Sequence, residues 1–344
     1  MNNLLIIDGS ALLSTSYYGN LPPEIKFLKD KSQESLYWDK ILHSPSGMYT
    51  NGIYSFMVKL EKILKEQKPT HIAITFDMTR DTFRRKLYPE YKANRSETPQ
   101  PLKMQRDFLP QMLTDMGIKT FWHPNFEGDD IIGSLVDKFS NEINISILSG
   151  DHDMMQLIRP GVQLWYMTHS IQKAKEKYYQ YTQGNTDFTL ESLNLPEGVF
   201  PYGKDSTKWE MGVYPEQIAD LKGLSGDSSD NIPGVKGISE KTASILLSEY
   251  GTVEKLFNYI ENHSDEEIKK EWKEKLGINR PPVKAIKADK AKESAILCKK
   301  LATIITGLKI ELPLDDFLIT NIKNDIKHNY YNQLSFKSLL RETL

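Results

Sequence analysis

Acidic residues recur in short motifs along this sequence, and several of them stand directly after an apolar run. The nine acids in these motifs are Asp8, Asp77, Glu127, Asp129, Asp130, Asp151, Asp153, Asp227 and Asp230. Nine carboxylates gathered without partners would repel one another strongly. Hard cations with oxygen ligands remove that repulsion, so the pattern predicts a site for Mg²⁺ or Mn²⁺. Zinc would lack its usual ligands, because the sequence has no cluster of cysteine and histidine.

Two such ions about 4 Å apart can hydrolyse a phosphodiester without a side-chain nucleophile, since one activates water and the other stabilises the leaving oxygen. We therefore expect two ions, or three, at the acidic site. Each motif taken alone also has a structural interpretation. Asp129 and Asp130 could be first-turn acids of a helix, and Asp227 to Asp230 could be a helix cap or a calcium loop. Their coincidence with the ends of apolar runs favours the metal site.

Three apolar runs are placed to bring these acids together. They are residues 4–8, 71–77 and 144–151, and amphipathic stretches typical of helices cover residues 53–66, 102–116 and 129–139. Strands alternating with helices predict an α/β fold with a mostly parallel sheet flanked by helices. Parallel strands point their carboxyl ends to one edge, where ligands bind. Strands are about 4.8 Å apart, so Asp8, Asp77 and Asp151 should lie within one or two such spacings.

A basic track follows the second apolar run. Residues 80–106 contain eight Lys or Arg against three Asp or Glu, although the net charge of the whole chain is −2. Cations beside an acidic site could neutralise the phosphate being cut, which makes Lys92 and Arg95 candidate catalytic residues. Arg84 is a candidate DNA contact, and Tyr91 could stack on an unpaired base. A solvated loop is the alternative interpretation of such a charge run.

A glycine-rich turn at residues 223–243 is the most specific stretch of the sequence. Glycines allow close approach to a ligand, and a helix beginning near residue 240 would point its amide groups at a DNA phosphate. The candidate DNA-binding residues here are Gly234, Val235, Lys236, Gly237, Lys241 and Thr242. A turn between two packed helices is the alternative.

Length and composition bound the remaining expectations. The 344 residues are enough for two domains, which we place at residues 1–180 and 181–344. No apolar run is long enough to span a membrane, and the single cysteine, Cys298, fits a reducing cytoplasm. We expect a cytoplasmic monomer.

Taken in order, these motifs resemble the 5′ nuclease family, which includes the 5′→3′ exonuclease domain of bacterial DNA polymerase I and stand-alone flap endonucleases. The resemblance starts at residues 7–9, continues through 76–77, 91–95, 127–130 and 150–153, and is most specific at residues 226–237. It implies a PIN-like nuclease domain followed by a helix–three-turn–helix DNA-binding domain. It also implies that the nine acids surround the metal pair, that Lys92 and Arg95 lie in a helical arch, and that the turn from Gly234 to Gly237 holds K⁺.

The implied substrate is DNA with a free 5′ end, a flap or a nick, or an RNA–DNA hybrid, cut during primer removal and repair. No polymerase activity is expected. His152 stands where the family usually has Lys or Arg, and Ser239 where it often has Gly. Residues 18–45 and 168–210 are longer than is typical and have no assigned role.

Two other functions were considered. A haloacid-dehalogenase-type phosphatase needs a nucleophilic aspartate two residues before Asp8, and that position is Ile6. A non-catalytic protein that binds DNA structures would be expected to have lost some of the nine carboxylates, and all nine are present.

Overall fold

The computed structural model describes residues 2–168, 170–184 and 189–342, which are organised around a six-stranded sheet. The strands are β1 (Asn3–Asp8), β2 (His71–Thr75), β3 (Lys119–Phe121), β4 (Asn144–Ser149), β5 (Val162–Met167) and β6 (Val199–Tyr202). Their order is β3-β2-β1-β4-β5-β6, and all neighbouring pairs are parallel except β5 and β6. The predicted mostly parallel sheet is confirmed. The three apolar runs form β2, β1 and β4, which are neighbours, so the aspartates that end them share one edge.

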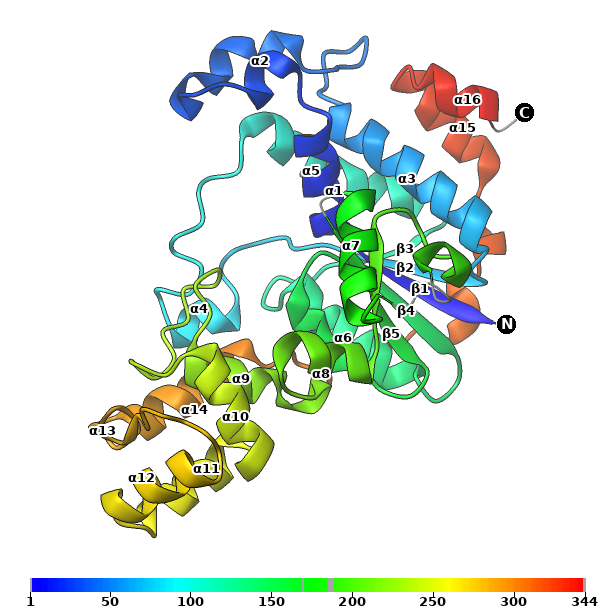
Figure 1. Ribbon diagram of the computed structural model, residues 1–344. Helices are drawn as coiled ribbons and strands as arrows, with labels where there is room; N and C mark the ends of the chain where they lie inside the picture. Colours follow the sequence, from blue (N-terminus) through cyan, green and yellow to red (C-terminus); the bar gives the residue numbers. More distant parts are fainter. Residues whose placement is uncertain (1, 169, 185–188, 343–344) are drawn as a thin grey trace.

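Helices cover both faces of the sheet (Figure 1). On one face lie α1 (Gly9–Gly19), α3 (Asn51–Gln67) and α5 (Gln100–Asp115), and on the other lies α6 (Gly128–Phe139). Alternation along β1 sends Leu5 and Ile7 into the first layer and Leu4 and Ile6 into the second. Both layers fix the end of β1, and therefore Asp8.

The chain between β2 and α5 crosses the edge of the sheet where the strands end. It forms the short helix α4 (Phe83–Leu87) and then an irregular connection up to α5, at the left of Figure 1. A 3₁₀ helix (His152–Leu157) follows β4 at the same edge.

The two longer segments form structure of their own. The first holds α2 (Pro23–Lys26) and a 3₁₀ helix (Lys31–Lys40), and the second holds α7 (Ile171–Tyr181), a 3₁₀ helix (Leu190–Leu193), β6 and α8 (Lys204–Met211). No helix or strand was predicted for the second segment. Strand β6 has only four residues, one of them Pro201, so it lacks a period-two pattern long enough to read.

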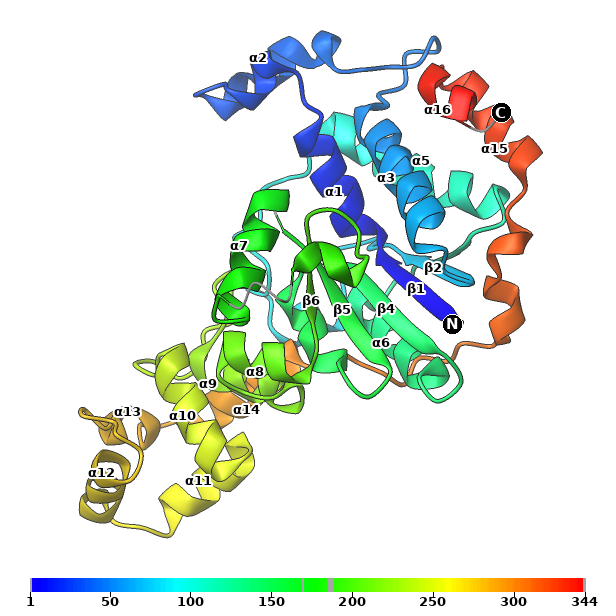
Figure 2. The same cartoon turned by 45° about the vertical axis from the view of Figure 1, so that its right-hand side comes forward.

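The second half of the chain is helical. It comprises a 3₁₀ helix (Pro215–Gln217), α9 (Ile218–Ser225), α10 (Glu240–Tyr250), α11 (Val253–Glu261), α12 (Asp265–Glu274), α13 (Val283–Ile286) and α14 (Ala291–Ala302). Figure 2 shows this group beside the sheet at the lower left. Helix α9 packs on the turn after β4, so the helical group borders the acidic edge.

The last elements return to the sheet domain. Two 3₁₀ helices (Leu314–Phe317 and Ile319–Asn321) lead to α15 (Asn324–Gln333) and α16 (Lys337–Glu342), and the Tyr331 hydroxyl donates to Glu61 Oε1 on α3 at 2.7 Å. The division between residues 180 and 181 remains a prediction, while the sheet itself extends to Tyr202. No helix in the described ranges is long and apolar enough to cross a membrane.

Candidate active site

The strand-end acids are held in place by hydrogen bonds between neighbouring elements. Asp8 caps α1 by accepting from the Ala11 amide at 2.9 Å, and its other oxygen accepts from the Ser149 hydroxyl at the end of β4 at 2.8 Å. Asp77 accepts from the Gly128 amide at 2.7 Å, at the start of α6. These bonds join the ends of β1, β2 and β4 and the first turn of α6 into one unit.

The charges of these acids act on one another. Burial, followed by the charges of Asp77 and Asp151, raises the pKa of Asp8 to about 7. Burial, followed by the charges of Asp151 and Asp8, holds the pKa of Asp129 well above its ordinary value. Burial is also the main cause that raises the pKa of Asp151. Buried carboxylates that raise one another's pKa values have too little positive charge around them. A divalent cation bound to their oxygens would supply that charge.

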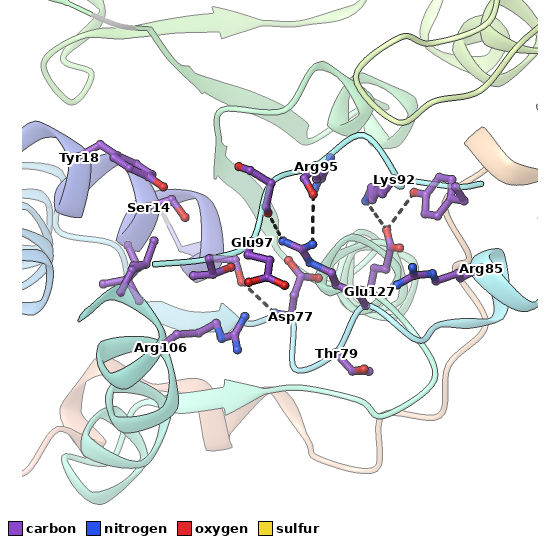
Figure 3. A pocket seen from close by; sticks show the side chains of 17 residues that line it. Ser14, Tyr18, Asp77, Thr79, Arg85, Lys92, Arg95, Glu97, Arg106 and Glu127 are labelled. Carbon is purple, nitrogen blue, oxygen red and sulfur yellow. Dashed lines mark hydrogen bonds and ion pairs between the residues drawn. The ribbon is translucent and has the colours of Figure 1, made fainter. Parts of the chain in front are cut away.

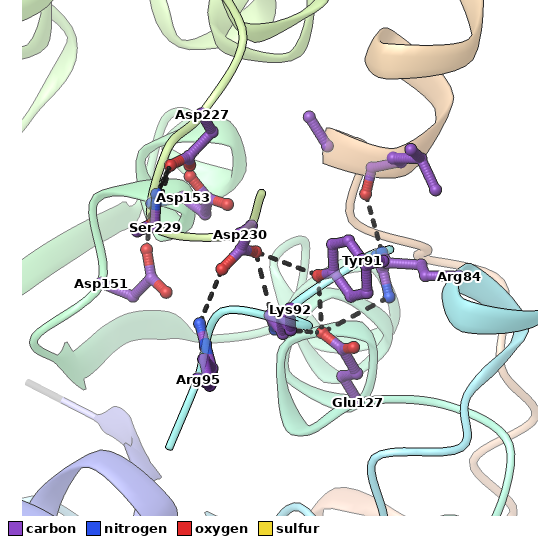
Figure 4. Close-up of polar contacts among 12 residues, drawn as sticks. Arg84, Tyr91, Lys92, Arg95, Glu127, Asp151, Asp153, Asp227, Ser229 and Asp230 are labelled. Atoms are coloured by element: carbon purple, nitrogen blue, oxygen red, sulfur yellow. Dashed lines mark hydrogen bonds and ion pairs between the residues drawn. The ribbon is translucent and has the colours of Figure 1, made fainter. Parts of the chain in front are cut away.

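A second group of acids is paired with the basic track (Figure 4). Lys92 Nζ lies 2.7 Å from Glu127 Oε2 and 3.6 Å from Asp230 Oδ2, and Arg95 Nη2 lies 2.6 Å from Asp230 Oδ1. Burial alone would lower the pKa of Lys92, but Glu127 and Asp230 outweigh it and keep that pKa well above its ordinary value. The two candidate catalytic cations therefore remain charged beside the acidic edge.

Tyr91 is part of the same cluster rather than a surface ring. Its side chain is only 4% exposed, and its hydroxyl donates to Asp230 at 3.0 Å and to Glu127 at 3.2 Å. In this arrangement the ring cannot stack on a base. Its placement supports a role in holding the two acids.

Arg84 and Asp130 form a buried pair away from solvent. Arg84 Nη1 and Nη2 each lie 2.7 Å from one oxygen of Asp130, which is fully buried, and Arg84 also donates to the carbonyls of Leu301 and Thr303. The Asp130 oxygens further accept from the amides of Glu127 and Ile305. This geometry does not expose Arg84 to DNA or leave Asp130 free to bind a metal. The pair instead ties α4 and α6 to the end of α14.

Asp153 and Asp227 share a cation that the sequence analysis did not name. Lys222 on α9 forms ion pairs with Asp153 and, at 2.5 Å, with Asp227. Burial alone would raise the pKa of Asp227, but Lys222 and the hydrogen bonds from Ser229 lower it to about 2. Lys222 is the only Lys or Arg between residues 214 and 235, and that isolation was a usable signal.

The ligand set consists of oxygen donors, which suits a hard divalent ion. Within the described ranges, however, no three Asp, Glu, His or Cys side chains are already arranged to hold a metal ion. In the second group, which comprises Glu127, Asp153, Asp227 and Asp230, lysines occupy the space between the acids: Lys222 pairs with Asp153 and Asp227, and Lys92 with Glu127 and Asp230. Metal binding at the second group therefore requires these side chains to move aside.

The glycine turn is fixed by contacts within the helical group. Gly234 has φ +66°, and a Cβ there would lie 2.2 Å from the Gly226 nitrogen, so only glycine fits. Its carbonyl accepts from the Ser294 hydroxyl at 2.8 Å. Gly234 and Val235 are buried, whereas Lys236, Gly237 and Lys241 are exposed and Thr242 is partly so.

Comparison with known proteins decides the family. The model of the 5′-3′ exonuclease N-terminal resolvase-like domain matches residues 3–184, and that of the 5′-3′ exonuclease C-terminal SAM fold matches residues 213–325. The chain belongs to the 5′-3′ exonuclease family. The fold predicted from the motifs, a PIN-like domain followed by a helical domain, is confirmed by this membership.

Individual members of this family are similar to the chain over most of its length. The chain is 34% identical over 340 residues to DNA polymerase I of Bacillus caldotenax, covering 98% of this chain and 32% of that protein, so it spans about a third of that relative. It is 34% identical over 255 residues to the 5′-3′ exonuclease of Bacillus subtilis (strain 168), covering 74% and 73% of the two chains. A bacteriophage T5 flap endonuclease complex with DNA and metal ions has a TM-score of 0.57 at 16% identity, covering 97% of this chain and 98% of that one.

In this 5′-3′ exonuclease fold, a pocket of about 240 Å³ opens beside the acids (Figure 3). Its wall combines Asp77 and Glu127 with Lys92, Arg85 and Arg106. Arg80, which also lines it, donates to the carbonyls of Arg95 and Ser96 and so braces the irregular connection. The pocket offers a negatively charged strand both positive charge and access to the acidic edge.

Proposed function

We propose that this 5′-3′ exonuclease family member is a metal-dependent, structure-specific nuclease that hydrolyses DNA phosphodiesters at 5′ ends, nicks and flaps. The observation that carries the proposal is the gathering of acids at one edge of the sheet, where Asp8 is bonded to the end of β4 and Asp77 to the first turn of α6, which carries Asp129. Burial and neighbouring carboxylates raise the pKa values of Asp8, Asp129 and Asp151 there. A divalent cation stabilises such a group, because it removes the repulsion between the ionised carboxylates. We propose Mg²⁺ or Mn²⁺, two ions or three.

Each acid then has a proposed role. One ligand group is Asp8, Asp77, Asp129 and Asp151, and the second is Glu127, Asp153, Asp227 and Asp230. When bound, the ions supply an activated water and charge for the leaving oxygen. Asp130 holds Arg84 and fixes the first turn of α6, so we assign it a positioning role in place of ligation.

Lys92 and Arg95 act on the substrate. Both are charged and lie within 4 Å of the acids at the pocket wall, where a phosphate of the strand would enter. Lys92 is held there by its backbone, which has φ +55° and donates to the Asp230 carbonyl at 2.9 Å. When the strand enters, its phosphate can take the place of the carboxylates as the partner of these cations.

The exposed residues of the glycine turn are proposed to hold the duplex. Lys236, Gly237, Lys241 and Thr242 can contact the DNA backbone, and Gly234 and Val235 shape the turn from inside. A K⁺ ion on the carbonyls of this turn, action on RNA–DNA hybrids, a monomeric state and a cytoplasmic location are part of the same proposal.

The test compares 5′-labelled flap, nicked and blunt substrates with Mg²⁺ and with chelator. We expect short 5′ products from the flap and the nick only when Mg²⁺ is present. An Asp129→Asn variant should bind the flap with unchanged affinity and leave it intact. A wild-type protein that binds the flap in Mg²⁺ without shortening it would instead be a non-catalytic DNA-binding protein.

A further inference from the structure

The turn that carries Asp151 and Asp153 is supported by an aromatic stack. His152, between the two acids, lies flat on the ring of Tyr166, with centroids 4.2 Å apart and planes at 15°. The edge of Tyr202 meets the same imidazole at 6.0 Å. Tyr166 is paired in register with Ser149, the last residue of β4. The stack therefore lies one strand away from the acidic edge.

A lysine from the second long segment closes this stack. Lys177 Nζ, on α7, lies 5.8 Å from the ring centroid of Tyr166, 5.6 Å from that of Phe200 and 5.3 Å from that of Tyr202. It also pairs with Glu210 Oε1 on α8 at 2.9 Å. A partly desolvated ammonium over aromatic faces is held more firmly than one in water. Lys177 is thus directed inward and links α7, β5, β6 and α8.

Few bonds within the turn itself fix the direction of Asp151 and Asp153. The 3₁₀ helix that begins at His152 has six residues, and within the turn itself the Asp153 amide donates to Asp151 Oδ1 at 2.8 Å. The residues after Asp153 are anchored in the core by Met154 and Met155, whereas His152, between the two acids, is oriented by the stack under Lys177. Groups behind metal ligands commonly set their orientation and so their affinity for the ion.

We propose that α7 is a positioning element of the active site, in which Lys177, acting through Tyr166 and His152, sets the orientation of Asp151 and Asp153. This gives the segment of residues 168–210 a role in metal binding. The inference rests on the proposed function, since it concerns the same ligands.

The test is Lys177→Met, which keeps the length of the side chain and removes its charge. The Mg²⁺ concentration for half-maximal flap cleavage should rise roughly tenfold, as for other groups behind metal ligands, while the Kd for flap DNA in chelator stays unchanged. Lys177→Arg should restore most of the wild-type Mg²⁺ dependence. The matched control is Lys175→Met on the same helix, whose ion pair is with Glu191 and not with the rings. It should leave the Mg²⁺ dependence unchanged.

An unchanged Mg²⁺ dependence in Lys177→Met, even with a lower Tm, would overturn the proposal, because a purely structural role moves only Tm. If Lys177→Met does not fold, His152→Ala and His152→Phe make the same test. Phenylalanine keeps the stack and should shift the Mg²⁺ midpoint less than alanine, and equal shifts would contradict the proposal.

If the wild type does not cleave at all, the proposed function fails. The positioning role is then tested by the Mg²⁺ concentration that gives half of the full rise in Tm. Equal concentrations in Lys177→Met and in wild type would overturn it.

Discussion

Lys222 Nζ lies 2.5 Å from Asp227 Oδ2 and also pairs with Asp153, within the group of acids to which we assign metal binding. The lysine neutralises two carboxylates that would otherwise be left together in a place where all three side chains are less than 15% exposed. A divalent cation bound by these acids would therefore compete with this ammonium group for the same oxygens.

The first prediction concerns that competition. Lys222→Met should lower the free energy of unfolding of the metal-free protein by about 3 kcal/mol, because one partner of a buried ion pair is lost. Mg²⁺ should then raise Tm more than it does in wild type, since no ammonium group has to be displaced. Thermal melting with and without millimolar Mg²⁺ measures both effects. Lys292→Met, which removes an exposed pair with Glu261, is the control and should change neither. A smaller Mg²⁺ effect in Lys222→Met would show that the lysine assists the ion.

The second prediction separates the neighbouring acids Asp129 and Asp130. Asp129→Asn should abolish cleavage and leave stability unchanged or slightly higher, because it removes charge from a group whose members repel one another. Asp130→Asn should lower the free energy of unfolding by about 3 kcal/mol, because buried Arg84 loses its bidentate partner and keeps only Glu127, 3.8 Å away, as a counter-charge. Urea unfolding and flap cleavage on both variants decide this. Equal stability of the two would contradict the role assigned to Asp130.

The third prediction distinguishes a residue that acts in catalysis from one that only binds DNA. Lys92→Met should slow cleavage by roughly 10²-fold while flap affinity changes little, because its charge acts at the reacting phosphate. Lys236→Met should instead weaken binding and reduce the slope of log K against log salt by about 0.9, which is the effect of losing one phosphate contact. Single-turnover cleavage and binding at several salt concentrations test both. The assignment of Lys92 fails if its loss weakens binding and cleavage by the same factor.

The fourth prediction uses two glycines with the same backbone angle. Gly234 and Gly277 both have φ +66°, but a Cβ on Gly277 would have nothing within 4 Å. Gly277→Ala should therefore cost about 1 kcal/mol, for the positive φ alone. Gly234→Ala should cost at least about 3 kcal/mol, because the added carbon also collides with the Gly226 backbone. Urea unfolding measures the loss of stability in both variants. Similar losses would mean that the backbone at Gly226 moves aside easily, which would contradict the tight turn.

Much of the fold could be predicted because local pattern and global structure agree. The runs that became β1, β2 and β4 are apolar and end in aspartate, and the helices between them have clear periodicity. Strand β6 was missed because it is short, contains Pro201 and is stabilised by pairing with β5 rather than by its own sequence. Helix α7 was missed because Lys177, a polar residue in the pattern, is packed inward on aromatic rings.

The site was predicted at the level of residue types but not of pairings. Nine acids were named as candidate ligands from their motifs, but the bond between Arg84 and Asp130 joins residues 46 positions apart, and that between Lys222 and Asp153 joins residues 69 apart. No local pattern records such contacts. For the same reason Tyr91, which stands in a basic run, was interpreted as a surface ring. In the fold its hydroxyl donates a hydrogen bond to Asp230.

Binding of Mn²⁺ at equilibrium, measured from the loss of the free-ion spin-resonance signal, tests the central claim most directly. The gathering of the strand-end acids predicts about two ions bound per chain, with at least one site lost in Asp129→Asn and none lost in Lys175→Met. A wild-type chain that binds no Mn²⁺, or an Asp129→Asn variant that binds it as wild type does, would contradict the account.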